Sequence, residues 1–132
     1  ITYYCDWYHD DQPFPMRTRS GKPLITIPYT MDVNDAIVLH RQQFEAADFE
    51  RMMIRAFDVL YREGDTQPRV LCLALHPFVM GQPHRIKHLE RALAHITKHE
   101  GVWMATGQEI ADWYIHHHLA PMKAHLGWEQ GA

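Results

Sequence analysis

An apolar run that ends at a histidine limits the fold more than any other segment of the chain. Both alternating faces of residues 70–75, VLCLAL, are apolar, and His76 and Pro77 follow directly. A strand with one face in solvent alternates apolar and polar residues, whereas a strand buried on both faces is continuously apolar. The run therefore predicts a strand of a parallel sheet that is covered by helices on both sides.

Three further segments have the composition of strands. They are residues 1–5 (ITYYC), 24–29 (LITIPY) and 102–105 (VWMA), and the first two are rich in β-forming residues. Residues 9–23 are predicted to form a loop because Asp, Pro and Gly are dense there. Residues 30–43 are polar and lack a regular period, so an irregular connection is predicted there as well.

Helical patterns fill the intervals between these strands. Apolar residues recur at helical spacing over residues 47–62, and a second helix is predicted over residues 83–99. Thr106 followed by Glu109 is a capping-box pattern, which predicts the start of a third helix. Pro121 is expected to end the regular structure, because a proline inside a helix removes a backbone hydrogen bond.

Strands and helices that alternate along a chain form parallel sheets with right-handed crossovers. The predicted order of strand, loop, strand, helix, strand, helix, strand and helix fits half of a (β/α) barrel or a small open sheet. We favour half a barrel, because the apolar run is covered on both faces and the chain begins directly in a strand pattern. We expect this α/β unit over residues 1–120 and an irregular or weakly helical tail over residues 121–132.

In α/β barrels the reactive side chains lie where strands end and the following loops begin. Four such strand ends are expected to converge on one rim of the fold. They contain Asp6 and Trp7, then Pro28 and Tyr29 with Asp32, Asn34 and Asp35, then His76 and Pro77, and finally Ala105 and Thr106. The candidate site therefore draws on residues that are far apart in the sequence.

His76 has the side chain best suited to acid–base catalysis, because histidine titrates near neutral pH and a neighbouring carboxylate adjusts it. Asp6 is the candidate for that carboxylate, and Trp7, Tyr29 and Pro77 are candidates for the wall of a substrate pocket. Structural alternatives stand beside these roles. His76 would then be a boundary residue bonded to a backbone carbonyl, Asp6 a turn carboxylate and Trp7 part of the core.

Charge and hydropathy exclude two classes of partner. The formal net charge of −3 at pH 7 argues against a nucleic-acid partner, since phosphate contacts need a basic surface. No apolar run approaches the roughly 20 residues that span a bilayer, so we expect no membrane partner. A cytoplasmic location is a separate expectation. Cys5 and Cys72 are the only cysteines, and two cysteines do not predict a disulfide framework.

Histidines at helical spacing raise the question of a metal site. His84 and His88 are four residues apart, as are His95 and His99, so each pair lies on one face of the predicted helix. A zinc ion needs three or four ligands at about 2 Å, and the two pairs are roughly 16 Å apart along a helix. They cannot share one ion. We interpret them as a half-exposed polar border and predict no metal ligand or cofactor in this chain.

Five segments of the chain resemble one known family. They are YYCDWYHDDQPFPM (residues 3–16), PLITIPYTMDVND (23–35), FDVLYREG (57–64), LALHPFVMGQPHRIKHLERAL (73–93) and HEGVWMATGQEIADWY (99–114). In order and spacing they resemble the C-terminal half of the polysaccharide deacetylase (NodB-like) superfamily, in the branch that also holds allantoinase-type and peptidoglycan-deacetylase-like members. The resemblance runs from Tyr3 to about His117.

The resemblance implies a distorted (β/α) barrel that hydrolyses a non-peptide C–N bond. The bond is either the N-acetyl amide of a sugar, as in a polysaccharide deacetylase, or a cyclic amide, as in allantoinase-type members. It assigns His76, with Leu73 and Leu75, to the family's late Leu-x-His motif, whose histidine is the general acid for the leaving amine. It assigns Asp6 and Trp7 to the Asp-Trp motif, which lines the pocket and tunes that histidine.

Two earlier motifs of the family have no counterpart in this chain. An Asp-Asp motif supplies the general base and one metal ligand, a His-x-x-x-His motif supplies two more ligands, and both precede the Asp-Trp motif. Only five residues precede Asp6 here, and the His84–His88 pair follows His76. We therefore expect a fragment that is inactive alone. A divalent metal such as zinc in the intact protein would be bound by residues outside this chain, and the alternative is an intact protein that works without a metal, as some allantoinase-type members do.

The same resemblance sets the expected partners. They are the N-terminal half of the same protein, a small-molecule or glycan substrate and further copies of the protein in a homo-oligomer. A non-catalytic ligand-binding module derived from a degenerate barrel is the alternative to an enzyme, because a half barrel leaves strand edges and part of its core unpaired.

Overall fold

The computed structural model describes residues 1–7 and 10–128 and divides the chain into two compact units. One unit combines Ile1–Pro28 with Met104–Ala132, and the other is Tyr29–Trp103. Among the described residues, none of the helices has the length and apolar character needed to cross a membrane.

The first unit contains a three-stranded sheet in the order β1-β3-β2. Strand β1 (Tyr3–Tyr4) pairs in parallel with β3 (Leu24–Thr26), which pairs on its other side with the antiparallel strand β2 (Phe14–Met16). The predicted strands over residues 1–5 and 24–29 are thus confirmed in shorter form. The prediction of a loop over residues 9–23 is wrong, because the segment contains β2.

Strand β2 was not predicted because its sequence, Phe-Pro-Met, has a proline at its centre. Proline cannot donate a hydrogen bond to a neighbouring strand and is therefore confined to edge strands. Strand β2 lies at an edge of the sheet, and Pro15 is buried there opposite Ile25. The surrounding turn residues therefore favoured a loop, whereas pairing with β3 stabilises a strand.

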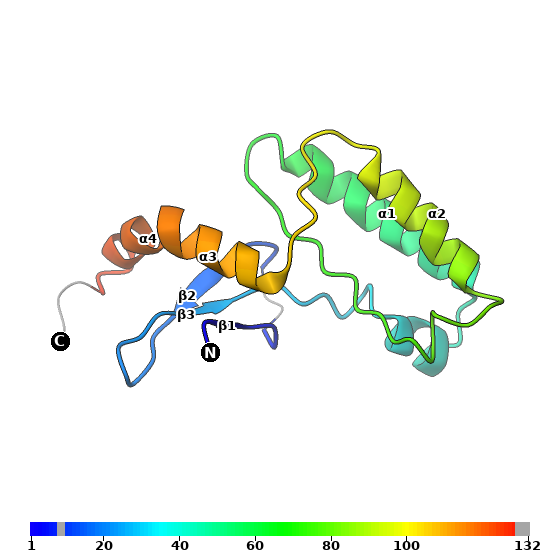
Figure 1. The fold of residues 1–132 in the computed structure, drawn as a ribbon, viewed down its shortest axis with the longest axis horizontal. Helices are drawn as coiled ribbons and strands as arrows, with labels where there is room; N and C mark the ends of the chain where they lie inside the picture. The colour runs from blue at the N-terminus through cyan, green and yellow to red at the C-terminus, as the bar shows by residue number, and fades with distance from the viewer. Residues whose placement is uncertain (8–9, 129–132) are drawn as a thin grey trace. The chain divides into compact units, whose positions relative to one another are not determined.

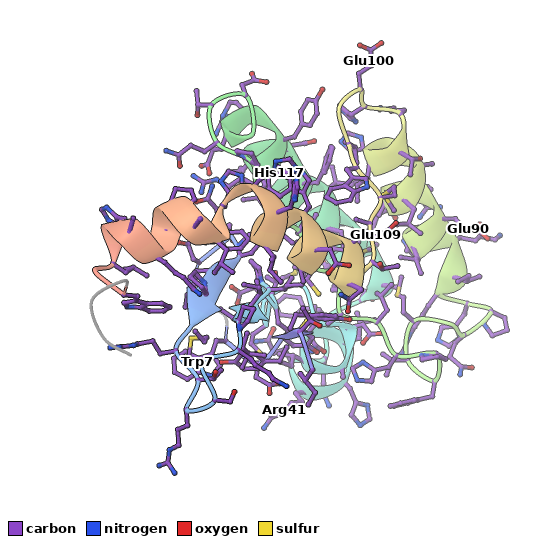
Figure 2. The ribbon with its side chains drawn as sticks, turned by 60° about the vertical axis from the view of Figure 1, so that its left-hand side comes forward. Trp7, Arg41, Glu90, Glu100, Glu109 and His117 are labelled. Carbon is purple, nitrogen blue, oxygen red and sulfur yellow. The ribbon has the colours of Figure 1, made fainter. Side chains whose placement is uncertain are left out.

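Two helices complete the first unit. Helix α3 (Gly107–His117) contacts β1 and β3, and helix α4 (Leu119–His125) contacts β2. The capping box predicted at Thr106 and Glu109 is confirmed, since the carboxylate of Glu109 accepts the backbone N–H of Thr106 at 2.7 Å. Figure 2 labels Glu109 in this first turn of α3.

The prediction that regular structure ends at Pro121 is wrong. Pro121 is the third residue of α4, and the helix continues to His125. The first N–H groups of a helix have no partner within the helix, so a proline there removes no hydrogen bond. The tail, predicted as irregular or weakly helical, is helical up to His125, and residues 129–132 lie outside the described residues.

The second unit is built on two parallel helices. Helix α1 (Ala46–Glu63) and helix α2 (Ile86–Thr97) lie side by side and run in the same direction (Figure 1). Both agree with the predicted helices, apart from the ends of α2. A short π-helix, η1 (Ala36–Arg41), precedes α1, so the irregular connection predicted over residues 30–43 is wrong in part.

The segments that lead into η1 and α2 also run parallel to each other. They meet at a single bridge between Asn34 and Ala74, where Asp35 donates its backbone N–H to the Ala74 carbonyl at 3.0 Å. The strand predicted over residues 70–75 is wrong as a continuous strand, because the segment that pairs with it turns into η1 two residues after Asn34 and is too short to form a ladder. The strand predicted over residues 102–105 is wrong too, and Trp103 and Met104 are exposed.

The core of the second unit lies between α1, α2 and the two bridged segments. Its buried side chains are Val33, Val38, Leu39, Phe49, Met53, Val79, Met80 and Ala92. Val79 and Met80 belong to the turn that follows His76. The core therefore holds in place the segment that carries the candidate catalytic histidine.

Candidate active site

His76 lies beside a buried carboxylate at the end of the bridged segments. Its ring Nδ1 is 2.6 Å from Oδ1 of Asp35, and its backbone N–H donates to Oδ2 of the same side chain at 2.8 Å. The backbone N–H of Met80 also donates to Oδ2, at 3.2 Å. Asp35 and His76 follow the two bridged residues by one and two positions respectively, as the strand-end rule predicts for a reactive site.

The two partners differ in their access to solvent. The Asp35 side chain is fully buried, whereas 36% of the His76 side chain is exposed. A buried carboxylate must be satisfied by hydrogen bonds, and here three N–H groups satisfy it. Because an ionised carboxylate only accepts hydrogen bonds, Nδ1 of His76 carries the proton in this pair. The other ring nitrogen, Nε2, takes no part in this contact with Asp35.

A tight turn after His76 fixes this arrangement. The His76 carbonyl accepts the backbone N–H groups of Val79 and Met80 at 2.9 and 3.0 Å. A side chain at Gly81 would lie 2.4 Å from the carbonyl oxygen of Pro77, a distance that only glycine avoids. Gly81 therefore allows the turn to return Met80 to the Asp35 carboxylate.

Tyr29 belongs to the same polar region. Its hydroxyl oxygen accepts a hydrogen bond from the side chain of Asn34 at 3.1 Å, and Asn34 is itself buried. Asn34 also accepts the backbone N–H groups that begin η1. Tyr29 is thus hydrogen-bonded to Asn34, which is the residue next to Asp35. Pro77 is exposed and follows His76 directly.

Asp6 and Trp7 lie in the first unit, and both are exposed. Burial of Tyr4, together with the negative charge of Asp6, raises the pKa of the Tyr4 hydroxyl. The role of Asp6 as the carboxylate that tunes His76 stays a prediction. The carboxylate in contact with His76 is Asp35, which was one of several acidic residues at a predicted strand end. Nothing in the sequence pattern ranked it above Asp6.

The histidine pair nearest the candidate site takes part in a bridge between helices. His88 Nδ1 is 2.6 Å from Glu50 on α1, and Arg91 donates two hydrogen bonds to the same carboxylate at 2.9 and 2.7 Å. The hydrogen bond from Arg91 is the main cause that lowers the pKa of Glu50 to about 2. His84, the other member of the pair, is exposed.

Acidification is expected to weaken this bridge. The pKa of Glu50 falls from 4.5 to about 2 on folding, so the stabilisation is present above pH 4.5 and is lost as the pH falls towards 2. The shift corresponds to at most about 3 kcal/mol, and solvent screening reduces it because Arg91 is half exposed. Urea unfolding of the wild type and Glu50→Gln between these pH values measures the loss.

The exposed Glu90 of α2 provides the matched control. Glu90→Gln is expected to retain the acid-dependent loss of the wild type, whereas Glu50→Gln is less stable at neutral pH and loses less on acidification. Equal acid dependence in the wild type and Glu50→Gln would contradict the assignment.

Comparison with known proteins places this geometry in a family. No protein-family model matches the chain. It is 38% identical over 130 residues to a Schizosaccharomyces pombe protein designated a polysaccharide deacetylase, a match that covers 90% of this chain and 40% of the relative. It is 32% identical over 111 residues to the peptidoglycan deacetylase of Helicobacter pylori, covering 84% of this chain and 32% of the relative.

Two solved structures share its fold. A Pseudomonas aeruginosa protein designated a polysaccharide deacetylase superimposes with a TM-score of 0.82 at 37% identity, over 88% of this chain and 39% of the other. Puue allantoinase superimposes with a TM-score of 0.84 at 38% identity, over 89% of this chain and 40% of the other. The chain belongs to the NodB-like deacetylase superfamily.

Membership of the NodB-like superfamily confirms the family resemblance and the fold class of a partial (β/α) barrel. The parallel helices α1 and α2 and the parallel bridge between their leading segments are the parts of that barrel in the second unit. The chain spans 40% or less of the length of the curated NodB-like relatives it matches.

The residues around His76 do not fit a metal centre. Both oxygens of Asp35 accept hydrogen bonds from protein N–H groups, so His76 could offer an ion only one nitrogen, Nε2, without a second ligand from this carboxylate. Among the described residues, the group of three or more histidine, cysteine or acidic side chains close enough to share an ion lies elsewhere. The residues around His76 therefore form a hydrogen-bonded histidine–carboxylate pair rather than a set of metal ligands.

Proposed function

We propose that this chain forms part of a hydrolase that cleaves a non-peptide C–N bond, the N-acetyl amide of a sugar, and that His76 is its general acid. The observation that carries the proposal is the buried Asp35 carboxylate 2.6 Å from Nδ1 of the half-exposed His76. The relatives designated polysaccharide and peptidoglycan deacetylases support the substrate class.

The chemistry of amide hydrolysis explains why such a pair is needed. Water adds to the amide carbonyl, and the tetrahedral intermediate collapses only if the departing nitrogen gains a proton. The Nε2–H of a doubly protonated His76 supplies that proton. The Asp35 charge stabilises the imidazolium and fixes the ring orientation, as the acidic partner of a catalytic histidine does. The base that activates the water is expected among residues outside this chain.

A second candidate reaction is the opening of a cyclic amide. Puue allantoinase superimposes on 89% of this chain, and the same proton donor would serve a ring nitrogen as leaving group. The two candidates differ in the product released, which is acetate in one case and an open-chain ureide in the other.

Assays of the full-length protein against N-acetylated oligosaccharides and allantoin test the proposal. Acetate release is the expected result, and the isolated 132-residue chain is expected to release none because it lacks the base. Opening of allantoin without acetate release would favour the second candidate. A folded full-length protein that turns over neither substrate would support a non-catalytic ligand-binding module. Turnover by the isolated chain would contradict the assignment of the base to other residues.

We also propose that the chain acts together with the N-terminal half of the same protein and assembles as a homo-oligomer. The partial coverage of the relatives supports the first expectation. The second rests on the tendency of the family branch.

A further inference from the structure

A group of three potential metal ligands lies where helices α1 and α2 end. Asp58 projects from α1, and His95 on α2 and His99 just beyond it complete the group. One ligand atom from each residue lies within 4.8 Å of the others. In the part of the chain that the structure describes, this is the group of three that stands out. We propose that it binds a first-row divalent transition-metal ion, with Zn²⁺ as the principal occupant.

The parallel packing of α1 and α2 assembles the group. His95 projects from α2 towards α1, and the turn that follows α2 brings the ring of His99 to within 4.9 Å of the His95 ring, measured between centroids. Because the helices run in the same direction (Figure 1), the last turns of both lie together. Nε2 of His95 is 2.7 Å from Oδ1 of Asp58. Sequence spacing alone gave only the two histidines, and the third ligand comes from a different helix.

The hydrogen bond of His99 prepares its ring for a metal. Nδ1 of His99 lies 2.7 Å from the backbone carbonyl of His95. A carbonyl only accepts hydrogen bonds, so Nδ1 is the donor and the lone pair is on Nε2. Metal-binding histidines almost always donate their other ring N–H in this way, often to a backbone carbonyl, which fixes the tautomer and the ring orientation.

Aromatic packing restricts the motion of both rings. The buried ring of Phe57 lies edge-on to His95 and His99, with centroids 5.8 and 4.9 Å away, and Tyr61 packs against His99 at 4.9 Å. The opposite side is open, since half of the Asp58 side chain is exposed. An ion can therefore enter from solvent towards ligands whose orientation is already limited.

The donor set selects the kind of ion. Two imidazole nitrogens and one carboxylate oxygen suit Zn²⁺, with a fourth position left for water. Mg²⁺ and Ca²⁺ prefer oxygen ligands throughout. The carboxylate of Glu50 is already paired with Arg91, so it is less suited to bind an ion than the carboxylate of Asp58. With Asp58 as the one charged ligand, a bound divalent ion would keep a net positive charge.

The position of the group indicates a stabilising role. Helix α2 has 12 residues, which is roughly 18 Å of helix between the turn after His76 and the group. In β/α folds the face that carries the helix C-termini lies opposite the catalytic face and serves stability. A bound ion would connect the ends of α1 and α2 without contact with His76.

Zinc titration of the chelator-treated full-length protein tests the proposal. Isothermal titration calorimetry and thermal unfolding are expected to show a Zn²⁺ site whose occupation raises Tm, in addition to any site formed by residues outside this chain. This site should be absent from Asp58→Asn, His95→Gln and His99→Gln, so each variant binds one Zn²⁺ fewer than the wild type. Loss of an outer partner weakens metal binding by roughly 10- to 100-fold, and loss of a ligand should weaken Zn²⁺ binding at this site by at least as much. With Co²⁺ as a probe, the same variants should lose the visible absorption bands that this site contributes.

Two controls separate this site from other histidines. His84→Ala, which alters an exposed histidine beyond the other end of α2, should bind Zn²⁺ as the wild type does. A variant with His116, His117 and His118 replaced by alanine reports on adventitious binding by that exposed run. Equal zinc binding by wild type and Asp58→Asn would overturn the proposal, as would loss of the site in the triple variant alone. Asp58 is half exposed, so Asp58→Asn decides the matter if a histidine variant fails to fold.

Discussion

Replacing His76 by alanine in the full-length protein is expected to lower kcat/KM for the amide substrate by at least about 10²-fold, the usual contribution of a general acid. The physical reason is the leaving nitrogen, which departs poorly without a proton. The measurement is steady-state acetate release by the wild type and the variant under the same conditions.

Substrates with different leaving groups distinguish an acid from a residue that only shapes the pocket. The defect of His76→Ala should shrink when the leaving group is stable without protonation, because the acid is then dispensable. His84→Ala, which alters an exposed histidine eight positions further along the chain, should keep wild-type rates. Normal amide turnover by His76→Ala would remove this residue from the mechanism.

Asp35→Asn is expected to have the second large effect, a fall in kcat of about 10²- to 10⁴-fold. The substitution keeps the size of the side chain but removes the charge that stabilises the protonated ring, and its amide group can reverse the hydrogen bond to Nδ1. Acetate release is again the measurement. Asp65→Asn, which changes an exposed acid in the turn that follows α1, is the matched control.

Asp35 also carries structural hydrogen bonds, so its variant needs a second readout. Two backbone N–H groups share Oδ2, and disturbing them is expected to reduce the free energy of unfolding by about 1–3 kcal/mol. Stability loss alone would lower the rates for all substrates equally in a folded sample. A positioning role predicts instead that the Asp35→Asn defect, like that of His76→Ala, is smaller for a good leaving group. Equal defects across leaving groups would contradict it.

The helices could be predicted from the sequence because their signals are local. Phe49, Met53 and Phe57 recur on one face of α1 and are buried, and the capping box of α3 uses residues three positions apart. Such patterns depend on helix geometry alone. The strands were harder to predict, because the short pairings of this chain depend on which distant segment lies alongside. The apolar run at residues 70–75 marked the segment that leads to His76, although this segment forms only one bridge.

The partners of the histidines could not be predicted, for a related physical reason. His76 was evident as a residue at the end of an apolar run, but its carboxylate is 41 positions away in the chain. Asp58 and His95 are 37 positions apart. Both pairs form because α1 and α2 are parallel, so the segments before them and corresponding turns of the two helices lie side by side. No local sequence pattern indicates which residue of α1 lies beside which residue of α2.

The contacts between α1 and α2 have a consequence for how the second unit moves. Glu50 and Asp58 are eight residues apart on α1, and their partners His88 and His95 are seven apart on α2, so the two bridges have nearly the same spacing of roughly 11 Å. Two helices joined by one bridge can rotate about it and slide past each other, whereas two bridges with matched spacing restrict both motions. Asp35 and His76 precede these helices. The two bridges therefore hold in one register the helices that follow Asp35 and His76, and a shift of α1 along α2 would have to break both of them.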